Sequence, residues 1–181
     1  RLEAFDKATI ENSFDRVKEC SQEIAFVNSH RSQMLIIQQL INEEKIPLRI
    51  THNDTKFNNV LFDLNNHATC IVDLDTVMPG SILFDFGDAI RTGANTALED
   101  EEDLSKVDLN LSIYSSYAKG FVEQTKEILS HSEIEYLAFS ARFMTFIIGL
   151  RFLTDFLQGD FYFRTNSPYH NLIRTRVQFK L

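Results

Sequence analysis

The sequence predicts a mainly α fold of the α+β class, in which helices form most of the chain and one β-hairpin interrupts them. Apolar residues recur at steps of three and four along several segments, which is the spacing of one helical face. Two short β-type runs flank an Asn-Asn pair, which is typical of a hairpin turn. The 181 residues, 44% of them hydrophobic, are enough to bury the core of one domain or one large lobe.

Two helices are predicted before the hairpin, from Glu11 to about Asn28 and from Ser29 to Glu44. Pro47 ends the second, because proline lacks a backbone N–H and its ring clashes with the preceding turn. We interpret both helices as scaffold. Their apolar faces are formed by Phe14, Val17, Cys20, Ile24 and Val27 in the first helix, and by Met34, Ile37 and Ile41 in the second.

The hairpin is predicted from the runs 60–62 and 69–72, with the turn at Asn65 and Asn66 and a short extended lead-in at 48–50. A hairpin returns the chain to the place it left, so Asp54 and Asp73 should face one ligand. If residues 73–75 are extended, the carboxylates of Asp73 and Asp75 project to the same side, because strand side chains alternate.

Three further helices are predicted after the hairpin: a short one through Arg91, one from Asn110 to about Leu129, and one running to Leu157. The Ser132–Glu135 segment has a capping-box pattern that would begin the last of these. Its middle is apolar nearly all round, which indicates a buried central helix. The acidic run 99–103 is interpreted as a solvated loop.

Composition argues against several partners. The formal net charge of −8 is unsuited to a nucleic-acid surface. Arg142, Arg151 and Asp155 interrupt the apolar helix, so we expect no membrane span. The two cysteines have no metal-site spacing and are too few for a disulfide framework, so we expect a reduced, cytoplasmic setting. No signal peptide is visible at the start of the sequence.

The segment Thr51–Asn59 and its sequel at residues 71–75 hold the side chains that phosphoryl transfer needs. Asp54 supplies a carboxylate that can orient and deprotonate a hydroxyl. Lys56 supplies a cation for the γ-phosphate. Asn59 and Asp73 supply oxygen atoms of the kind that Mg²⁺ prefers. Taken one by one, each has a simpler explanation: a turn cap for Asp54, a surface cation for Lys56, a hairpin entry for Asn59 and an exposed strand end for Asp73.

The spacing His52-x-Asp54-x-Lys56-x-x-Asn59 resembles the catalytic loop of protein kinases. Asn at position 53 and the following Val-Leu-Phe resemble the aminoglycoside and choline phosphotransferases more. Within that group the chain is most similar to the N-acetylhexosamine 1-kinases, and the resemblance covers most of the chain. The stretches that carry it are His52–Phe62, Ile71–Arg91 and Leu157–Leu181.

The resemblance implies that residues 1–181 form the C-terminal catalytic lobe of a protein-kinase-like fold. No Gly-rich loop and no strand lysine for the α- and β-phosphates precede the catalytic loop. We therefore expect the N-terminal ATP-binding lobe to be absent from this chain and the chain alone to have little or no activity. ATP is the expected co-substrate and Mg²⁺ the expected cofactor.

The resemblance also implies roles for individual residues. Asp54 would be the catalytic base, Lys56 would contact the γ-phosphate, and Asn59 with Asp73 would bind Mg²⁺ and the nucleotide phosphates. Asp75 would be a second-metal or supporting group. Two further residues would position the loop: His52 by hydrogen bonds towards the region of Asp73, and Asp85 by orienting the loop backbone.

The acceptor is expected to be recognised by the late part of the chain. Arg151 and Tyr162 are similar to the sugar-contacting Arg and Tyr of the resembling kinases, and Arg91 is a weaker candidate. A simpler explanation of Arg151 is an ion pair with Asp155, one helical turn away. The expected acceptor is the anomeric hydroxyl of an N-acetylhexosamine.

Three alternatives remain beside this one. The first is a kinase for choline, an amino alcohol or an aminoglycoside, although the Arg- and Tyr-rich tail favours a neutral sugar. The second is a metal-dependent glycosyltransferase using Asp73-x-Asp75, which leaves Asp54, Lys56 and Asn59 unexplained. The third is a non-catalytic kinase-like binding lobe, against which the presence of Asp54, Asn59 and Asp73 argues.

Overall fold

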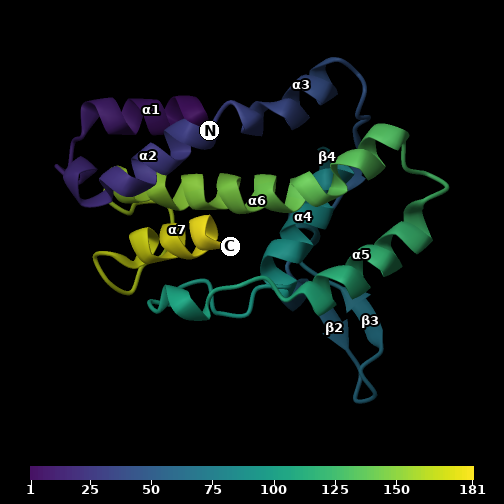
Figure 1. The fold of residues 1–181 in the computed structure, drawn as a ribbon. Coiled ribbons are helices and arrows are strands. Elements are labelled where there is room, and N and C mark those ends of the chain that lie inside the picture. Colours follow the sequence, from purple (N-terminus) through teal and green to yellow (C-terminus); the bar gives the residue numbers. More distant parts are fainter. The chain divides into compact units, whose positions relative to one another are not determined.

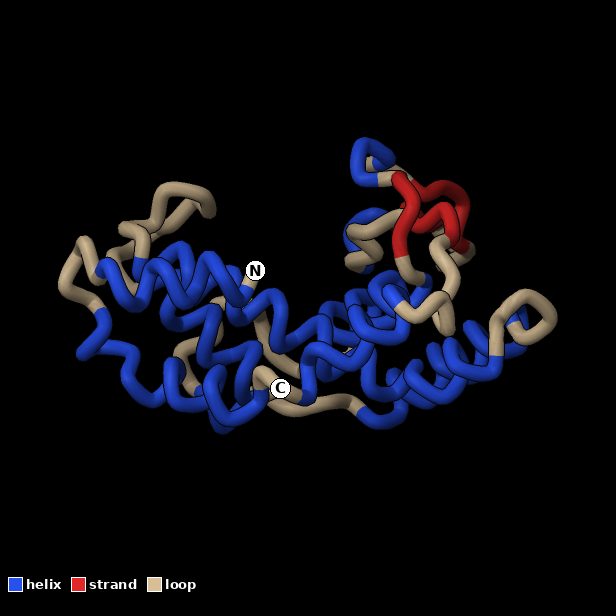
Figure 2. Tube along the Cα trace, turned by 90° about the horizontal axis from the view of Figure 1, so that it is seen from above, coloured by secondary structure: helices blue, strands red, loops and turns tan.

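A computed structural model describes all 181 residues and confirms a mainly α fold with a small β component (Figure 1). The strands are few and short beside the helices (Figure 2). In chain order the elements are α1 (Leu2–Glu11), α2 (Ser21–His30), α3 (Ile36–Asn42), β1 (Arg49–Thr51), β2 (Val60–Phe62), β3 (Ala68–Ile71), β4 (Met78–Gly80), α4 (Ile82–Gly93), α5 (Leu111–Thr125), α6 (His131–Leu157) and α7 (His170–Lys180).

The chain divides into two compact units, each built from separate stretches of sequence. The first unit comprises Arg1–Ile36, Thr96–Asp108 and Thr145–Leu181. The second comprises Ile37–Asn95 and Leu109–Met144. Helix α6 contributes its N-terminal part to the second unit and its C-terminal part to the first.

The first unit is helical and buries an apolar core between α1, α2, α7 and the end of α6. Helices α2 and α7 are in contact, and Arg176 on α7 donates a hydrogen bond to buried Glu23 on α2 at 2.6 Å. Helix α7 buries Leu172 and Val177 together with the polar side chains of His170, Asn171, Thr175 and Gln178. Its fully buried members include Phe5, Cys20, Val27, Leu150, Leu153, Phe156, Leu157, Leu172 and Val177.

The predicted helix from Glu11 to Asn28 is wrong, because the chain turns between α1 and α2. Asn12 and Asp15 both adopt positive φ angles, 41° and 55°. The Asn12 side chain accepts a hydrogen bond from the Val17 N–H at 3.1 Å, which replaces a helical bond. Asn and Asp tolerate the left-handed conformation better than other residues and compete for backbone groups in this way. The predicted helix from Ser29 to Glu44 is only partly present, as α3.

The second unit contains two separate antiparallel strand pairs. Strand β1 pairs with β4, with Thr51 opposite Met78, and β2 pairs with β3, with Val60 opposite Ile71. The predicted extended lead-in and the predicted hairpin are therefore confirmed. Both pairs lie next to the loop that joins β1 to β2, so they fix the two ends of that loop.

Helices α4, α5 and the first part of α6 pack in the second unit. Ser81 caps α4, and Asn110 caps α5 by accepting from the N–H groups of Ser112 and Ile113. Helix α4 lies close to α6 at Gly87, where a Cβ atom would be 2.3 Å from the carbonyl oxygen of Ser140. The short helix through Arg91 and the helix starting near Asn110 are thus confirmed.

The capping box of α6 is two residues earlier than predicted. Glu133 accepts from the Ser130 N–H at 2.7 Å, and the Glu133 N–H donates to the Ser130 hydroxyl at 3.2 Å. Both Ser-x-x-Glu spacings occur in the sequence, and the pair that forms is the one in which Glu133 also binds Arg49 on β1, at 2.7 Å. The cap therefore also attaches β1 to α6.

Helix α6 ends at Leu157 as predicted and is the one helix long and apolar enough to cross a membrane by length and composition. Half of its most apolar window is buried inside the protein. A core helix passes the same test, and the side chains of Phe146, Leu150, Leu153 and Phe156 are all buried.

Candidate active site

The loop between β1 and β2 is held by a carboxylate from α4. Asp85 accepts hydrogen bonds from the backbone N–H groups of His52, at 2.8 Å, and Asn53, at 2.7 Å. Asp85 lies in the first turn of α4, where the helix dipole favours a negative charge. Burial raises the pKa of the Asp85 carboxyl, and the two N–H donors oppose that rise. The loop backbone is thus anchored immediately before Asp54.

His52 joins this loop to the segment that carries Asp73. Its Nε2 lies 3.1 Å from the carbonyl oxygen of Val72, so Nε2 carries the proton and donates it. The other ring nitrogen, Nδ1, is buried and has no hydrogen-bond partner. The imidazole ring therefore holds the loop that carries Asp54 against the segment that carries Asp73.

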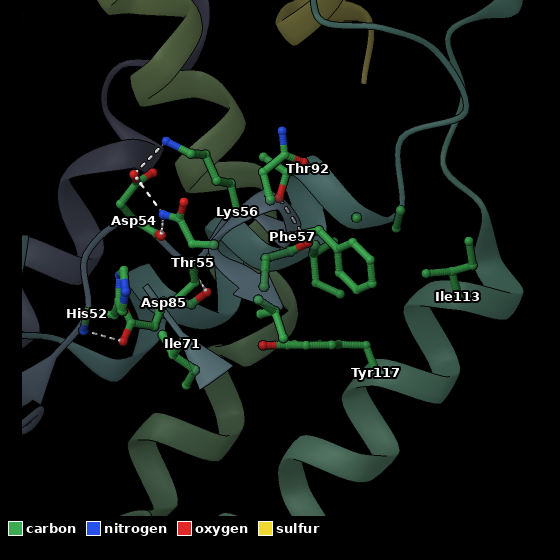
Figure 3. Close-up of a pocket in the computed structure, with 17 residues that line it drawn as sticks. His52, Asp54, Thr55, Lys56, Phe57, Ile71, Asp85, Thr92, Ile113 and Tyr117 are labelled. Carbon is green, nitrogen blue, oxygen red and sulfur yellow. Dashed lines mark hydrogen bonds and ion pairs between the residues drawn. The ribbon is translucent and has the colours of Figure 1, made fainter. Parts of the chain in front are cut away.

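Asp54, Lys56 and Asn59 form one hydrogen-bonded cluster. Figure 3 shows the Lys56 side chain reaching the Asp54 carboxylate. The Lys56 ammonium donates to Asp54 Oδ2 at 2.8 Å, and the Asn59 amide nitrogen donates to the same oxygen at 3.1 Å and to the Asp54 carbonyl at 2.8 Å. The hydrogen bond to Asp54 raises the pKa of the Lys56 ammonium, although partial burial opposes it. The cluster holds the Asp54 carboxylate in one orientation.

Asp73 lies close to the same cluster. Lys56 Nζ is 3.8 Å from Asp73 Oδ2, and the Val72 N–H donates to the Asn59 carbonyl at 2.9 Å. One cation thus lies within ion-pair distance of two carboxylates, those of Asp54 and Asp73. The hairpin brings the two predicted segments together as expected.

The predicted extended conformation of residues 73–75 is wrong. Asp73 is left-handed, with φ 64° and ψ 53°, and Leu74–Thr76 forms a 3₁₀ turn. The strand alternation that would have aligned Asp73 with Asp75 is therefore absent. Asp75 is exposed, and its side chain makes no hydrogen bond or ion pair.

The donor set fits a divalent cation of the Mg²⁺ class. The Asn59 side-chain nitrogen donates to Asp54. The neutral side-chain oxygen of Asn59 therefore points away from the Asp54 carboxylate. Asp73 presents a half-exposed carboxylate 3.8 Å from Lys56, one residue after Val72, whose N–H donates to the Asn59 carbonyl oxygen. The chain contains no group of three or more His, Cys, Asp or Glu side chains arranged for a metal. One amide and one carboxylate suit Mg²⁺, which keeps several waters and takes its remaining ligands from substrate phosphates.

A cavity of about 670 Å³ adjoins the cluster. Asp54, Lys56 and Asp85 lie on one side, and Ile113 and Tyr117 of α5 lie on the other (Figure 3). Tyr117 is 38% exposed as a residue, but partial burial of its phenol, together with the nearby Asp85 and Asp88 carboxylates, raises its pKa to about 12. The phenol therefore stays protonated at neutral pH. The remaining wall is largely apolar: Phe57, Val60, Ile71, Ala89, Ile90 and Ala94.

Arg151 and Tyr162 lie in the first unit, and there the structure brings them together. Arg151 Nη2 donates to the Tyr162 hydroxyl at 3.4 Å, and the guanidinium lies 5.6 Å from the Tyr162 ring centroid. Both line a smaller cavity of about 150 Å³. Asp155 does not pair with Arg151; it accepts from the N–H groups of Tyr162 and Phe163. The simpler explanation of Arg151 as a helical ion pair is therefore wrong. The weaker candidate, Arg91, is buried and pairs with Asp88 at 2.9 Å.

Sequence reasoning missed three residues at this site. Asn53 has a positive φ of 63°, and its side chain binds three backbone carbonyls. Thr55 donates to the Asp85 carbonyl oxygen. Tyr117 lines the cavity from α5. The Asn at position 53 was the available signal, since Asn is enriched at left-handed positions.

Comparison with known families agrees with this geometry. The sequence profile of the Phosphotransferase enzyme family (APH) matches residues 3–118, which is well over half of the chain. The matched range includes the whole cluster and both carboxylates near Lys56, whereas Arg151 and Tyr162 lie beyond it. Phosphoryl transfer to small molecules is the activity that this family implies, with ATP and a divalent metal in general use. The chain belongs to the phosphotransferase enzyme family.

Proposed function

We propose that this chain is the catalytic lobe of an ATP- and Mg²⁺-dependent kinase that phosphorylates the anomeric hydroxyl of an N-acetylhexosamine in the cytoplasm. The observation that carries the kinase chemistry is the shared hydrogen bonding of Asp54, Lys56 and Asn59 beside Asp73. Family membership supplies the reaction class.

The roles proposed for these residues follow from their contacts. Asp54, held by two donors, would orient the acceptor hydroxyl and accept its proton. Lys56 is poised to move from the carboxylates to a phosphate oxygen. Asn59 and Asp73 would hold the cation, which neutralises charge on the phosphates when bound. His52 and Asp85 would position the loop backbone.

Support for a neutral sugar comes from the first unit. Arg151 offers several N–H donors in a plane, and Tyr162 beside it offers a hydroxyl and an aromatic face. Such groups suit the hydroxyls and the acetamide of an amino sugar. A cationic acceptor, such as choline, would require acidic or aromatic side chains around its ammonium group. The Arg151 guanidinium would repel it.

The test uses the full-length protein with Mg²⁺-ATP and a panel of N-acetylhexosamines, other free sugars, choline and aminoglycosides. We expect phosphorylation of an N-acetylhexosamine to give an acid-labile product, because an anomeric phosphate hydrolyses in mild acid. An acid-stable product would move the acceptor hydroxyl, and phosphorylation of choline alone would overturn the sugar assignment.

Asp54→Asn is the catalytic control, with an expected loss in kcat of about 10²- to 10⁴-fold, the usual worth of a general base. Asp63→Asn is the matched variant. Asp63 lies on the exposed hairpin turn and accepts from the N–H groups of Asn65 and His67, which an Asn can also accept. Full activity of Asp54→Asn would remove Asp54 from the chemistry.

A further inference from the structure

Asn53 lies at the point where the catalytic loop begins, in a conformation that few residues adopt. Its φ of 63° is left-handed, and its backbone N–H donates to Asp85 Oδ1 at 2.7 Å. Asn accepts this conformation with less strain than most residues, because its short polar side chain can bind nearby backbone groups. The conformation directs the Asn53 side chain away from Asp54, towards β4 and the turn that precedes it.

The Asn53 side chain connects three backbone segments. Its amide nitrogen donates to the carbonyl oxygens of Thr51 at 3.2 Å, Thr76 at 3.1 Å and Met78 at 3.4 Å. Its amide oxygen accepts from the Thr51 hydroxyl at 3.0 Å. Thr76 closes the 3₁₀ turn that follows Asp73 and contains Asp75. The Asn53 side chain therefore binds both Thr51, at the start of the loop that carries Asp54, and the turn that follows Asp73.

The space for this side chain depends on Gly80. A Cβ atom at position 80 would lie 2.7 Å from Asn53 Oδ1 and 2.4 Å from the Thr51 hydroxyl oxygen. These distances are too short for real Cβ contacts, so any larger residue would displace the Thr51 side chain, the Asn53 side chain or both. The hydrogen bonds of the Asn53 side chain therefore depend on having glycine at position 80.

We propose that Asn53 is a positioning residue that locks the turn after Asp73 to the catalytic loop, and so fixes the cation-binding carboxylate relative to Asp54. This inference rests on the proposed function only for its catalytic readout. Asn53 touches neither substrate nor cation in this assignment. It acts by donating hydrogen bonds to the backbone carbonyl oxygens of Thr76 and Met78, at the end of the turn and just after it.

The test compares Asn53→Asp with the parent in the full-length protein. Asp keeps the size and the left-handed preference of Asn but lacks the amide donors, so the bond to the Thr76 carbonyl is lost. We expect the half-saturating Mg²⁺ concentration for phosphoryl transfer to rise about tenfold, the scale seen when groups that orient metal ligands are removed. We also expect backbone amides at residues 73–77 to exchange with deuterium about tenfold faster.

Asn66 provides the matched control. It has the same φ of 63°, lies at the exposed hairpin turn and makes no side-chain hydrogen bond. Asn66→Asp makes the same chemical change and should leave Mg²⁺ dependence and exchange at 73–77 unchanged. Asn53→Gly is the second variant, since glycine adopts φ 63° without strain and removes the whole side chain.

The outcomes separate the two proposals. Faster exchange at 73–77 in both Asn53 variants, with a raised Mg²⁺ requirement, supports the positioning role. Unchanged exchange, or an equal effect of Asn66→Asp, overturns it. Unfolding of both Asn53 variants while Asn66→Asp folds also overturns it, because Asn53 would then be a general stability residue. If the parent phosphorylates nothing in the panel, the kinase proposal fails, and deuterium exchange still decides the role of Asn53.

Discussion

Individual residues at this site balance one another electrostatically. The Asp54 and Asp73 carboxylates would repel at close range, and Lys56 lies within ion-pair distance of both. All three side chains are partly exposed, so solvent weakens each pair. A phosphate group can therefore compete for Lys56, whereas a buried pair would resist it. The Lys56 ammonium is available to a ligand because the site is open to solvent.

Asp85 gives a pH-dependent prediction at this scale. Burial raises its folded-state pKa above the ordinary 3.8. Asp85 therefore stabilises the fold fully below pH 3.8, and this contribution is lost as the pH rises through the folded pKa. Asp85→Asn removes the titration, so the stability of the parent relative to the variant should fall with rising pH, by at most about 1.4 kcal/mol per pH unit. Urea unfolding across the acidic range measures it, and a constant difference would contradict it.

Asp85→Asn should also lose activity. An Asn side chain can accept from one of the N–H groups of His52 and Asn53, but it presents a donor to the other. We expect kcat to fall about 10²-fold, the scale of a small misplacement of a catalytic group. Asp63→Asn is again the control, since that carboxylate accepts N–H groups away from the catalytic loop.

The sequence predicted which side chains come together better than it predicted their geometry. Residue type and spacing were sufficient to pick out Asp54, Lys56, Asn59 and Asp73, which the structure brings together. The conformation of Asp73 was not predictable from alternation, because a single left-handed residue ends a strand without any change in hydrophobic pattern. The role of the Asn53 side chain depends on three carbonyls brought together by folding.

At the scale of elements, helix α4 offers two glycines in contrasting surroundings. A Cβ at Gly87 would lie 2.3 Å from the Ser140 carbonyl oxygen, whereas a Cβ at Gly93 would meet nothing within 4 Å. Gly87→Ala should therefore separate α4 from α6 and lower the free energy of unfolding by about 1–3 kcal/mol. Gly93→Ala should be neutral or stabilise by up to about 1 kcal/mol, because alanine favours helix. Thermal unfolding compares them, and equal effects would refute the close contact.

The elements also show why helix prediction failed near the start. The apolar positions Phe14, Val17 and Cys20 keep helical spacing through a segment that is not one helix. The competing signal was Asn12 with Asp15, whose side chains and positive φ angles break the helix locally. Hydrophobic periodicity is therefore a poor guide to the core in this segment, where Cys20 is buried but Phe14 is 45% exposed.

At the scale of the whole molecule, helix α6 belongs to both compact units, and its burial identifies it as a core helix. Leu153 is fully buried, so Leu153→Ala should lower the free energy of unfolding by about 3 kcal/mol. Leu111→Ala, at an exposed position on α5, should have little effect. Chemical unfolding measures both. Flotation with lipid vesicles should leave the protein in the aqueous fraction, and flotation with the lipid would contradict the core-helix interpretation.

The left-handed backbone at Asp73 has a consequence for how this protein can evolve. Asn and Gly are the other residues that adopt that conformation with least strain. Both are reached from an Asp codon by one nucleotide change. The lineage can therefore lose the charge at position 73 without losing the fold. If Asp73 holds the cation as proposed, copies that fold but do not catalyse are one nucleotide change away. Duplicated genes of this kind should diverge in activity through this position sooner than through the helical core.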